Sequence, residues 1–230
     1  MFALITVLLL SYLVGSVPSS LWVGRLWKSV DVREHGSGNA GATNAFRVLG
    51  WKAGIVVLLL DFAKGFLATA VISQLAWEIG SGPVAPIAWE ANSFLLISCG
   101  VMAVLGHMYP IYASFNGGKG AATAAGMLYG IEPVSITITL VIFIGVILIT
   151  RYVSLGSMVA SFCYPLTQFA MVWIFDWVID PSVLIFSSAL ALFIIVKHHA
   201  NIRRLWNGTE SKVVLCPTPD PAEEKEEPEP

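Results

Sequence analysis

Charged residues are scarce in this chain of 230 residues. Only 12% of them are Asp, Glu, Lys or Arg, whereas 56% are hydrophobic and the mean hydropathy is +0.75. A globule of this length has too small an interior to hide that much apolar surface from water. The composition therefore excludes an ordinary water-soluble domain and predicts an integral membrane protein.

Cysteine is also scarce, and its placement excludes two kinds of site. Cys99 and Cys163 lie inside apolar runs, and Cys216 opens the C-terminal tail. This spacing matches neither a disulfide framework nor a metal site. His198 and His199 are neighbours, so on a helix they point about 100 degrees apart, and no nearby Cys or Asp completes a ligand set. We therefore predict no bound metal and no cofactor.

The acidic residues that do occur are concentrated at the C-terminus. Residues 216–230 contain six carboxylates and one lysine, interspersed with prolines. Such a segment cannot bury enough apolar surface to order itself. We therefore expect a single membrane domain over residues 1–212 and an acidic, disordered cytoplasmic tail over residues 213–230.

Long apolar runs predict the membrane spans. A crossing helix needs about 20 residues, and runs near that length cover residues 2–24, 53–76, 93–112, 133–150, 153–176 and 181–197. The connector between the first two runs is basic, the connector over 77–92 has no Lys or Arg, and segment 197–212 is basic again. By the positive-inside rule the two basic segments are cytoplasmic, and the connector over 77–92 and the N-terminus are external.

Six crossings cannot satisfy these assignments, because an even number would leave the C-terminal basic segment outside. The unused candidate for a seventh is residues 120–131, whose small residues suit close helix packing. At about 18 Å this element is shorter than the ~30 Å hydrocarbon core. We predict an all-α polytopic protein of about seven spans, one of them short. Its three polar segments, 25–52, 113–120 and 197–212, then share the cytoplasmic face.

The first polar segment predicts a loop that binds phosphate. Glycines let backbone amides approach an anion, and the neighbouring side chains supply neutral donors and one guanidinium. The alternative is a cytoplasmic loop with ordinary polar turns. The candidate binding residues are Gly38, Asn39, Gly41, Thr43, Asn44 and Arg47, with Ser37 as a further donor.

The second polar segment contains Gly117, Gly118, Lys119 and Gly120. It is not a Walker A loop, because the first glycine and the final Ser or Thr of that motif are missing, so no nucleotide is implied. Lys119 stands where the short helix would begin, which favours binding of a phosphoryl group. Its alternative is a lysine that extends to the membrane interface. His107, just before this segment, is a candidate binding residue or a ring that satisfies a carbonyl.

In the third polar segment, a continuous helix would place His198, Asn201 and Leu205 on one face, with Arg203 and Arg204 elsewhere. The alternative is a basic helix that binds anionic lipid. Asp61 and Lys64 lie within the second span at a spacing that lets them pair. We interpret that pair as structural.

Together, Gly36 through Arg47, Gly106-His107 through Thr123 and His198 through Glu210 closely resemble the PlsY family of bacterial acyl-phosphate-dependent glycerol-3-phosphate acyltransferases. The resemblance covers the chain to about residue 212. It implies a seven-span inner-membrane enzyme that moves an acyl group from acyl phosphate to the 1-hydroxyl of glycerol 3-phosphate, giving lysophosphatidic acid. The residues that match the family's polar pocket are Ser37, Arg47, Lys119, His198 and Asn201. Of these, Ser37, Lys119, His198 and Asn201 are the candidate catalytic residues.

An acyl phosphate is an activated anhydride, so transfer needs no covalent acyl-enzyme. The sequence contains no obvious His-carboxylate pair, which leaves His198 or a substrate phosphate oxygen as the base. The implied partners are the two substrates and membrane lipid, with the acyl-phosphate-producing enzyme as a further candidate and no nucleic acid. A transporter for a phosphorylated solute is the alternative function, although such proteins tend to contain internal repeats.

Overall fold

The computed structural model describes residues 2–79 and 90–213. All regular structure in these ranges is helical. The predictions for Cys216, for the acidic tail beyond residue 213 and for most of the connector over 77–92 lie outside the described residues. The main helices are α1 (Phe2–Gly15), α2 (Ser19–Lys28), α3 (Ala42–Leu49), α4 (Trp51–Leu67), α5 (Leu75–Ile79), α6 (Ala91–Met108), α7 (Ala121–Ile131), α8 (Pro133–Thr150), α9 (Val153–Phe175), α10 (Pro181–Lys197) and α11 (His199–Trp206).

Within the described residues, five segments are long and apolar enough to cross a membrane, and α10 with α11 forms a sixth that bends by 54°. The segment predicted to be a short apolar helix is α7. The five segments are Phe2–Lys28, Trp51–Ile79, Ala91–Ala113, Pro133–Thr150 and Val153–Phe175. These findings confirm the predicted all-helical membrane fold.

Two predicted helices are interrupted. The first predicted span divides into α1 and α2 because Pro18, at the start of α2, has no N–H and restricts the residue before it. The last span does not continue smoothly, since α10 ends at Lys197 and α11 begins after His198 at a sharp angle. Both breaks lie next to polar segments.

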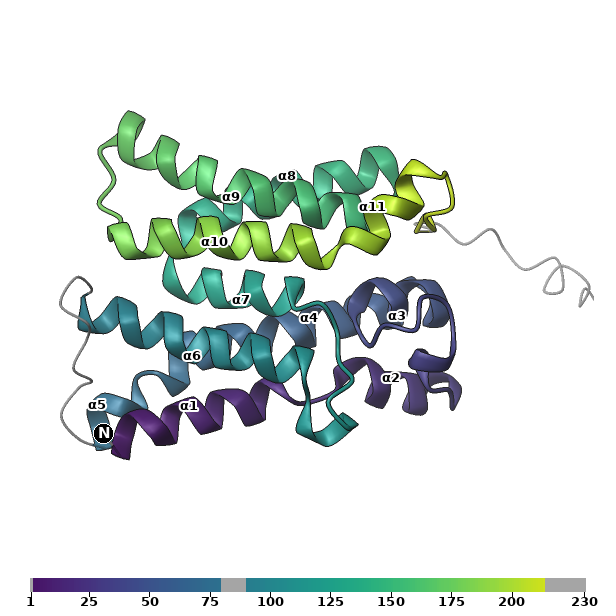
Figure 1. Cartoon of the computed structure of the whole chain (residues 1–230), viewed down its shortest axis with the longest axis horizontal. Helices are drawn as coiled ribbons and strands as arrows, with labels where there is room; N and C mark the ends of the chain where they lie inside the picture. The colour runs from purple at the N-terminus through teal and green to yellow at the C-terminus, as the bar shows by residue number, and fades with distance from the viewer. Residues whose placement is uncertain (1, 80–89, 214–230) are drawn as a thin grey trace, which may run out of the picture.

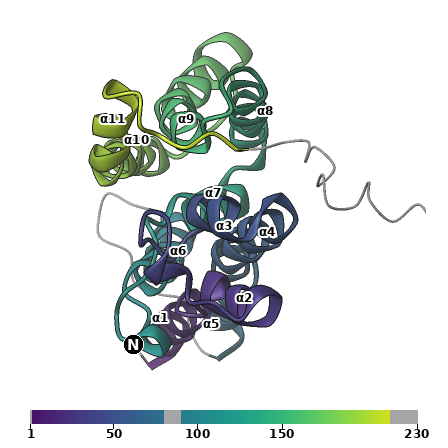
Figure 2. The same cartoon turned by 90° about the vertical axis from the view of Figure 1, so that its right-hand side faces the viewer.

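The helices form two groups with α7 between them. In Figure 1 the helices α8, α9 and α10 lie above α7, and α1, α4 and α6 lie below it; Figure 2 shows the same division from the end. The loop before α7, together with α2, α3 and α11, lies at one end of the molecule, opposite α5 and the N-terminus. The predicted gathering of three polar segments at one end is therefore confirmed.

Close packing between α4 and α7 fixes the centre of this arrangement. A Cβ added at Gly65 of α4 would overlap the carbonyl oxygen of Thr123, and one added at Gly126 of α7 would overlap that of Phe62. The two backbones therefore touch, which only residues without a side chain allow. Met127, also on α7, is fully buried in the main apolar cluster.

We predict that Gly65→Ala lowers the thermal unfolding temperature, because the new methyl group pushes α7 away from α4. Overpacking of this kind costs about 1–3 kcal/mol or more. Gly145→Ala is the matched control, since nothing lies within 4 Å of a Cβ added there on α8. The measurement is thermal unfolding of the purified proteins in detergent. Equal unfolding temperatures for the two variants would contradict the proposed contact.

Candidate active site

The three polar segments enclose one small polar pocket of about 50 Å³. Helices α3, α4, α6, α8, α9 and the α10–α11 junction contribute to its walls, as does the start of α7. Gly38, Gly117 and Gly118, although predicted as binding residues, do not line it. The predicted site residues that line it are Ser37, Asn39, Gly41, Thr43, Asn44, Arg47, His107, Lys119, Gly120, His198 and Asn201.

Two helices begin at this pocket, and each has a glycine as its N-cap. Gly41 precedes α3 and Gly120 precedes α7, and neither helix start has a capping side chain. Gly120 has a φ of +86°, a conformation that side chains disfavour. The first N–H groups of a helix have no acceptor within the helix and carry its positive dipole end. The pocket therefore contains two places where backbone amides can hold an anion.

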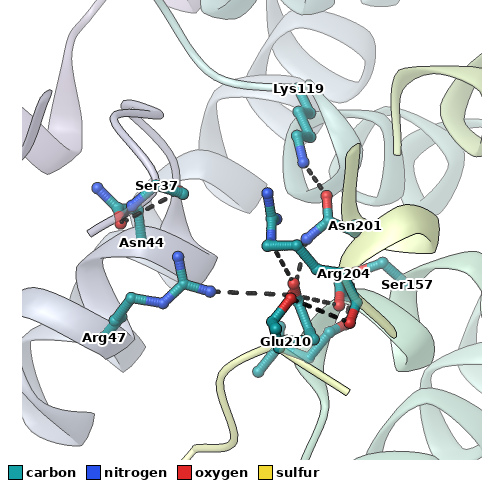
Figure 3. Close-up of polar contacts among 11 residues, drawn as sticks. Ser37, Asn44, Arg47, Lys119, Ser157, Asn201, Arg204 and Glu210 are labelled. Carbon is teal, nitrogen blue, oxygen red and sulfur yellow. Dashed lines mark hydrogen bonds and ion pairs between the residues drawn. The ribbon is translucent and has the colours of Figure 1, made fainter. Parts of the chain in front are cut away.

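Lys119, just before α7, and Arg47, in the last turn of α3, add cationic side chains to the same pocket. The ammonium of Lys119 donates a hydrogen bond to Oδ1 of Asn201, on α11 (Figure 3). Burial lowers the pKa of Lys119 to about 8, and the charges of Arg204 and Arg47 act in the same direction. Burial also lowers the pKa of Arg47, whose Nε is buried without a hydrogen-bond partner among the described residues. The pocket thus concentrates positive charge that an anion can neutralise.

Glu210 organises the C-terminal side of the pocket. It is only 6% exposed and accepts hydrogen bonds from Ser154 at 2.7 Å, Asn201 at 2.8 Å and Nε of Arg204 at 2.6 Å. Burial raises the pKa of Glu210, but these bonds outweigh it and hold the pKa below its ordinary value. Its carboxylate also lies 3.9 Å from the guanidinium of Arg47.

Arg203 and Arg204 were predicted to lie away from the face of His198 and Asn201. Arg203 is exposed, but Arg204 lies three residues after Asn201 on α11 and bonds to the same carboxylate, Glu210, without lining the pocket. Figure 3 shows Arg204 beside Asn201. The sequence analysis missed Glu210 as a site residue. Its one available signal was a lone carboxylate among the basic residues of segment 197–212.

Asn44 shapes the first loop instead of presenting free donors. Its Nδ2 donates to the carbonyl oxygens of Val32 at 2.7 Å and His35 at 3.1 Å. Its Oδ1 accepts from the backbone N–H of Ser37 at 2.8 Å and from the Ser37 hydroxyl at 3.2 Å. All the hydrogen-bonding capacity of the amide is used. Asn44, which is 1% exposed, therefore holds the loop that carries Ser37 at the pocket edge.

Gly117 and Gly118 dock the second loop onto α6. The N–H of Gly117 donates to the carbonyl of Met108 at 3.2 Å, and the N–H of Gly118 donates to the carbonyl of His107 at 3.1 Å. These amides, expected to hold phosphate, are already bonded. A Cβ at Gly118 would overlap Nε2 of His107, so glycine is required for this close approach. Their role is to seat the loop that presents Lys119.

A buried cluster of ionisable groups underlies this loop. Asp61 Oδ1 lies 2.7 Å from the ammonium of Lys64, which confirms the predicted pair. Nδ1 of His107 lies 3.5 Å from the same oxygen. The structure thus contains a His-carboxylate pair at the pocket. The sequence analysis missed it, because residues 61 and 107 meet only through the packing of α4 beside α6.

Residues 5–208 match the family model for glycerol-3-phosphate acyltransferases. This chain belongs to that family. A glycerol-3-phosphate acyltransferase of Salinibacter ruber is 46% identical over 215 residues, which is 93% of this chain and 93% of the relative. One of Chlorobaculum tepidum is 42% identical over 232 residues, covering 93% of this chain and 97% of the relative.

Two crystal structures of PlsY, an integral membrane glycerol 3-phosphate acyltransferase, have the same fold. One is its glycerol 3-phosphate form, with a TM-score of 0.71, and the other its lysophosphatidic acid form, with a TM-score of 0.70. Each is 33% identical in sequence, and each match covers 91% of this chain and 94% of the PlsY chain. The predicted family, the membrane fold and the activity of an acyltransferase that forms lysophosphatidic acid are therefore confirmed.

We predict that acyltransferase activity falls as pH rises through about 8, because Lys119 loses its charge there. The lysine is cationic below this pH and neutral above it, so kcat/KM should decline about tenfold per pH unit on the alkaline side. Lys119→Arg should move this alkaline limb upward, since guanidinium stays protonated. Lys52→Arg, at an exposed site, is the control and should keep the wild-type profile. An alkaline limb that stays in place in Lys119→Arg would exclude Lys119 as its source.

Proposed function

We propose that this acyltransferase takes its acyl group from acyl phosphate and transfers it directly to the 1-hydroxyl of glycerol 3-phosphate. The products are lysophosphatidic acid and inorganic phosphate. No covalent acyl-enzyme forms, because the donor is already an activated anhydride.

The observation that carries the proposal is an apolar cavity that lies next to the polar pocket and shares part of its wall. The cavity measures about 330 Å³ and is walled by side chains of α4, α7, α8, α9 and α10. Leu58, Ala121, Ala122, Phe143 and Ser157 line both spaces. A donor with a charged head and a hydrocarbon tail fits this junction, with phosphate in the polar pocket and the chain among apolar side chains.

The charge of the pocket suits two phosphate-bearing reactants. The N-termini of α3 and α7 can each receive one phosphoryl group, and the side chains of Arg47 and Lys119 line the same pocket. Lys119 directly precedes α7, whose first residues line both the polar pocket and the apolar cavity. We therefore assign Lys119 to the place where the acyl carbonyl meets the departing phosphate.

Transfer proceeds by attack of the 1-hydroxyl oxygen on the acyl carbonyl carbon. The bond from that carbon to the phosphate oxygen breaks, and phosphate leaves with the bonding electrons. A phosphate oxygen of the substrates accepts the hydroxyl proton. Lys119 and the free amides of α7 stabilise the charge that develops on the carbonyl oxygen and the leaving group.

The hydrogen bonding of His198 supports a substrate phosphate oxygen, and not His198, as the proton acceptor. Its Nδ1 lies 2.8 Å from the carbonyl oxygen of Ile194, so Nδ1 carries the proton and Nε2 is the free acceptor. A carbonyl, unlike a carboxylate, adds no negative charge to stabilise an imidazolium ion. We therefore assign His198 to binding and orienting substrate rather than to general-base catalysis.

We further propose that the pocket faces the cytoplasm of a bacterial cell, with the N-terminus outside and the protein in the inner membrane. The basic residues of segments 25–52 and 197–212 support this orientation by the positive-inside rule. Residues 1–212 then form the single acyltransferase domain, and 213–230 its cytoplasmic tail. The enzyme that makes acyl phosphate would reach the membrane from the same side.

We predict that purified protein in lipid vesicles converts radiolabelled glycerol 3-phosphate to lysophosphatidic acid when palmitoyl phosphate is supplied. Palmitoyl-CoA is the control donor and should give no product above background. Lys119→Gln should reduce kcat at least about a hundredfold, as removal of a group that stabilises developing charge does. Product formed only from palmitoyl-CoA would refute the assigned donor. Uptake of label without esterification would indicate a carrier.

We also predict that His198→Gln keeps measurable turnover, since an amide can replace the binding role of imidazole but not a base. The expected loss in kcat is less than about a hundredfold, below the range typical of a removed general base. Asn201→Ala is the companion variant, because it removes the hydrogen-bond partner of Lys119. Complete loss of turnover in His198→Gln with unchanged KM for both substrates would identify His198 as the base.

A further inference from the structure

The buried cluster of Asp61, Lys64 and His107 is costly, because charged groups in a membrane domain lose their water. Asp61 is 1% exposed, Lys64 5% and His107 6%. A buried ion pair of this kind is weak evidence for stability, since apolar residues of similar size often replace one without loss. Ionisable groups that persist inside a membrane protein usually serve a function. The cluster therefore calls for a use beyond packing.

One half of the Asp61 carboxylate is occupied and the other half is free. Oδ1 pairs with the ammonium of Lys64 at 2.7 Å and lies 3.5 Å from Nδ1 of His107. The same ammonium donates to the carbonyl of Val17 at 2.8 Å, at the break between α1 and α2. Oδ2 is buried and has no hydrogen-bond partner among the described residues. Asp61 is thus held rigidly with one acceptor unused.

Asp61 also belongs to the wall of the polar pocket, together with His107 and Lys119. An ionised carboxylate repels a phosphate group, so its free oxygen cannot serve the anionic parts of either reactant. It can accept a hydrogen bond from a hydroxyl group, and such a charge-assisted bond is strong. Glycerol 3-phosphate carries two hydroxyls, whereas acyl phosphate has no alcohol group. The chemistry of this oxygen therefore selects the glycerol part of the acceptor substrate.

We propose that Oδ2 of Asp61 accepts a hydrogen bond from the 2-hydroxyl of glycerol 3-phosphate. This inference rests on the proposed reaction at the same pocket. The 2-hydroxyl is the one that stays unmodified, and a carboxylate locked in an ion pair with Lys64 is suited to holding a hydroxyl. Fixing the 2-hydroxyl on α4 directs the 1-hydroxyl toward the first turn of α7. Asp61 would then contribute to acylation at the 1-position.

The test compares two acceptors in two proteins, in the form of a double-mutant cycle. The acceptors are glycerol 3-phosphate and 3-hydroxypropyl phosphate, which keeps the terminal hydroxyl and the phosphate but lacks the 2-hydroxyl. The proteins are the wild type and Asp61→Asn, and kcat/KM for the acceptor is measured with palmitoyl phosphate saturating. Asp31→Asn is the matched control, because Asp31 is also ion-paired but does not line the pocket.

In the wild type and in Asp31→Asn, loss of the 2-hydroxyl should lower kcat/KM about tenfold to a hundredfold, as expected for a lost hydrogen bond to a charged group. In Asp61→Asn the same change of acceptor should cost less than about threefold, because the charged partner is gone. A structural role would lower activity equally on both acceptors. Equal losses in wild type and Asp61→Asn overturn the proposal, as does a wild type indifferent to the 2-hydroxyl.

A second background guards against a folding defect in Asp61→Asn, which leaves Lys64 buried opposite a neutral amide. The double variant Asp61→Leu with Lys64→Met removes both charges and replaces them with apolar groups of similar length. It should show the same insensitivity to the 2-hydroxyl. If the wild type acylates glycerol 3-phosphate but the effect of the 2-hydroxyl does not depend on Asp61, only the proposed role of Asp61 is refuted. Absence of any acylation from acyl phosphate sinks the proposed function instead.

Discussion

The backbone contact between α4 and α7 determines how the start of α7 and Asp61 of α4 are placed in the pocket. Gly65 and Gly126 let the two helices touch, so the first turn of α7 is held at a fixed position along α4. That turn follows Lys119 directly and contributes walls to both the polar pocket and the apolar cavity. The opposing helix carries Asp61 into the same pocket. A shift of one helix relative to the other would separate the charge that binds phosphate from the cavity that suits an acyl chain.

Two of the buried carboxylates, Glu210 and Asp61, have different hydrogen-bonding roles near the pocket. Glu210 is fully engaged, and its three hydrogen bonds hold Arg204, Asn201 and Ser154 around one point. Because Glu210 holds the side chain of Asn201, it also fixes Oδ1 of Asn201, which accepts a hydrogen bond from the Lys119 ammonium. Asp61 is engaged on one oxygen only, because Lys64 occupies Oδ1 while Oδ2 has no partner among the described residues. Glu210 therefore positions cationic side chains, whereas Asp61 keeps one oxygen available to accept a hydrogen bond.

Much of the fold could be predicted from the sequence, because apolar length and basic connectors are local properties. Six crossings would have left the two basic segments on opposite sides of the membrane, so the sequence required one more crossing. The structure places the helix α7 in the candidate segment, residues 120–131. Proline and histidine breaks were harder to predict. The bend at His198 is not marked by any local pattern, and the pairing of Arg204 with Glu210 depends on where the chain after α11 places that carboxylate, so neither could be read from helical spacing.

Some features of the site could likewise be predicted from the sequence, and others could not. The glycine segments predicted anion binding, and the structure places Gly41 and Gly120 at the starts of two helices at the pocket. Gly117 and Gly118 share that composition, yet their amides bond to the end of α6. Composition alone cannot separate these uses, because the difference depends on which carbonyl groups tertiary packing brings close. The pairing of Asp61 with His107 was hidden for the same reason.

The shortness of α7 connects the fold to its chemistry. Its 11 residues reach about 16 Å, roughly half of the ~30 Å hydrocarbon core. A helix that spanned the whole core would begin at the membrane surface, so its N-terminus would lie outside the hydrocarbon core. A shorter one can begin deeper, where its positive N-terminus lies beside buried apolar side chains. The lysine and the first amides of α7 then lie beside the apolar cavity, so a single lipid substrate can place its charged group on one side of this boundary and its hydrocarbon chain on the other.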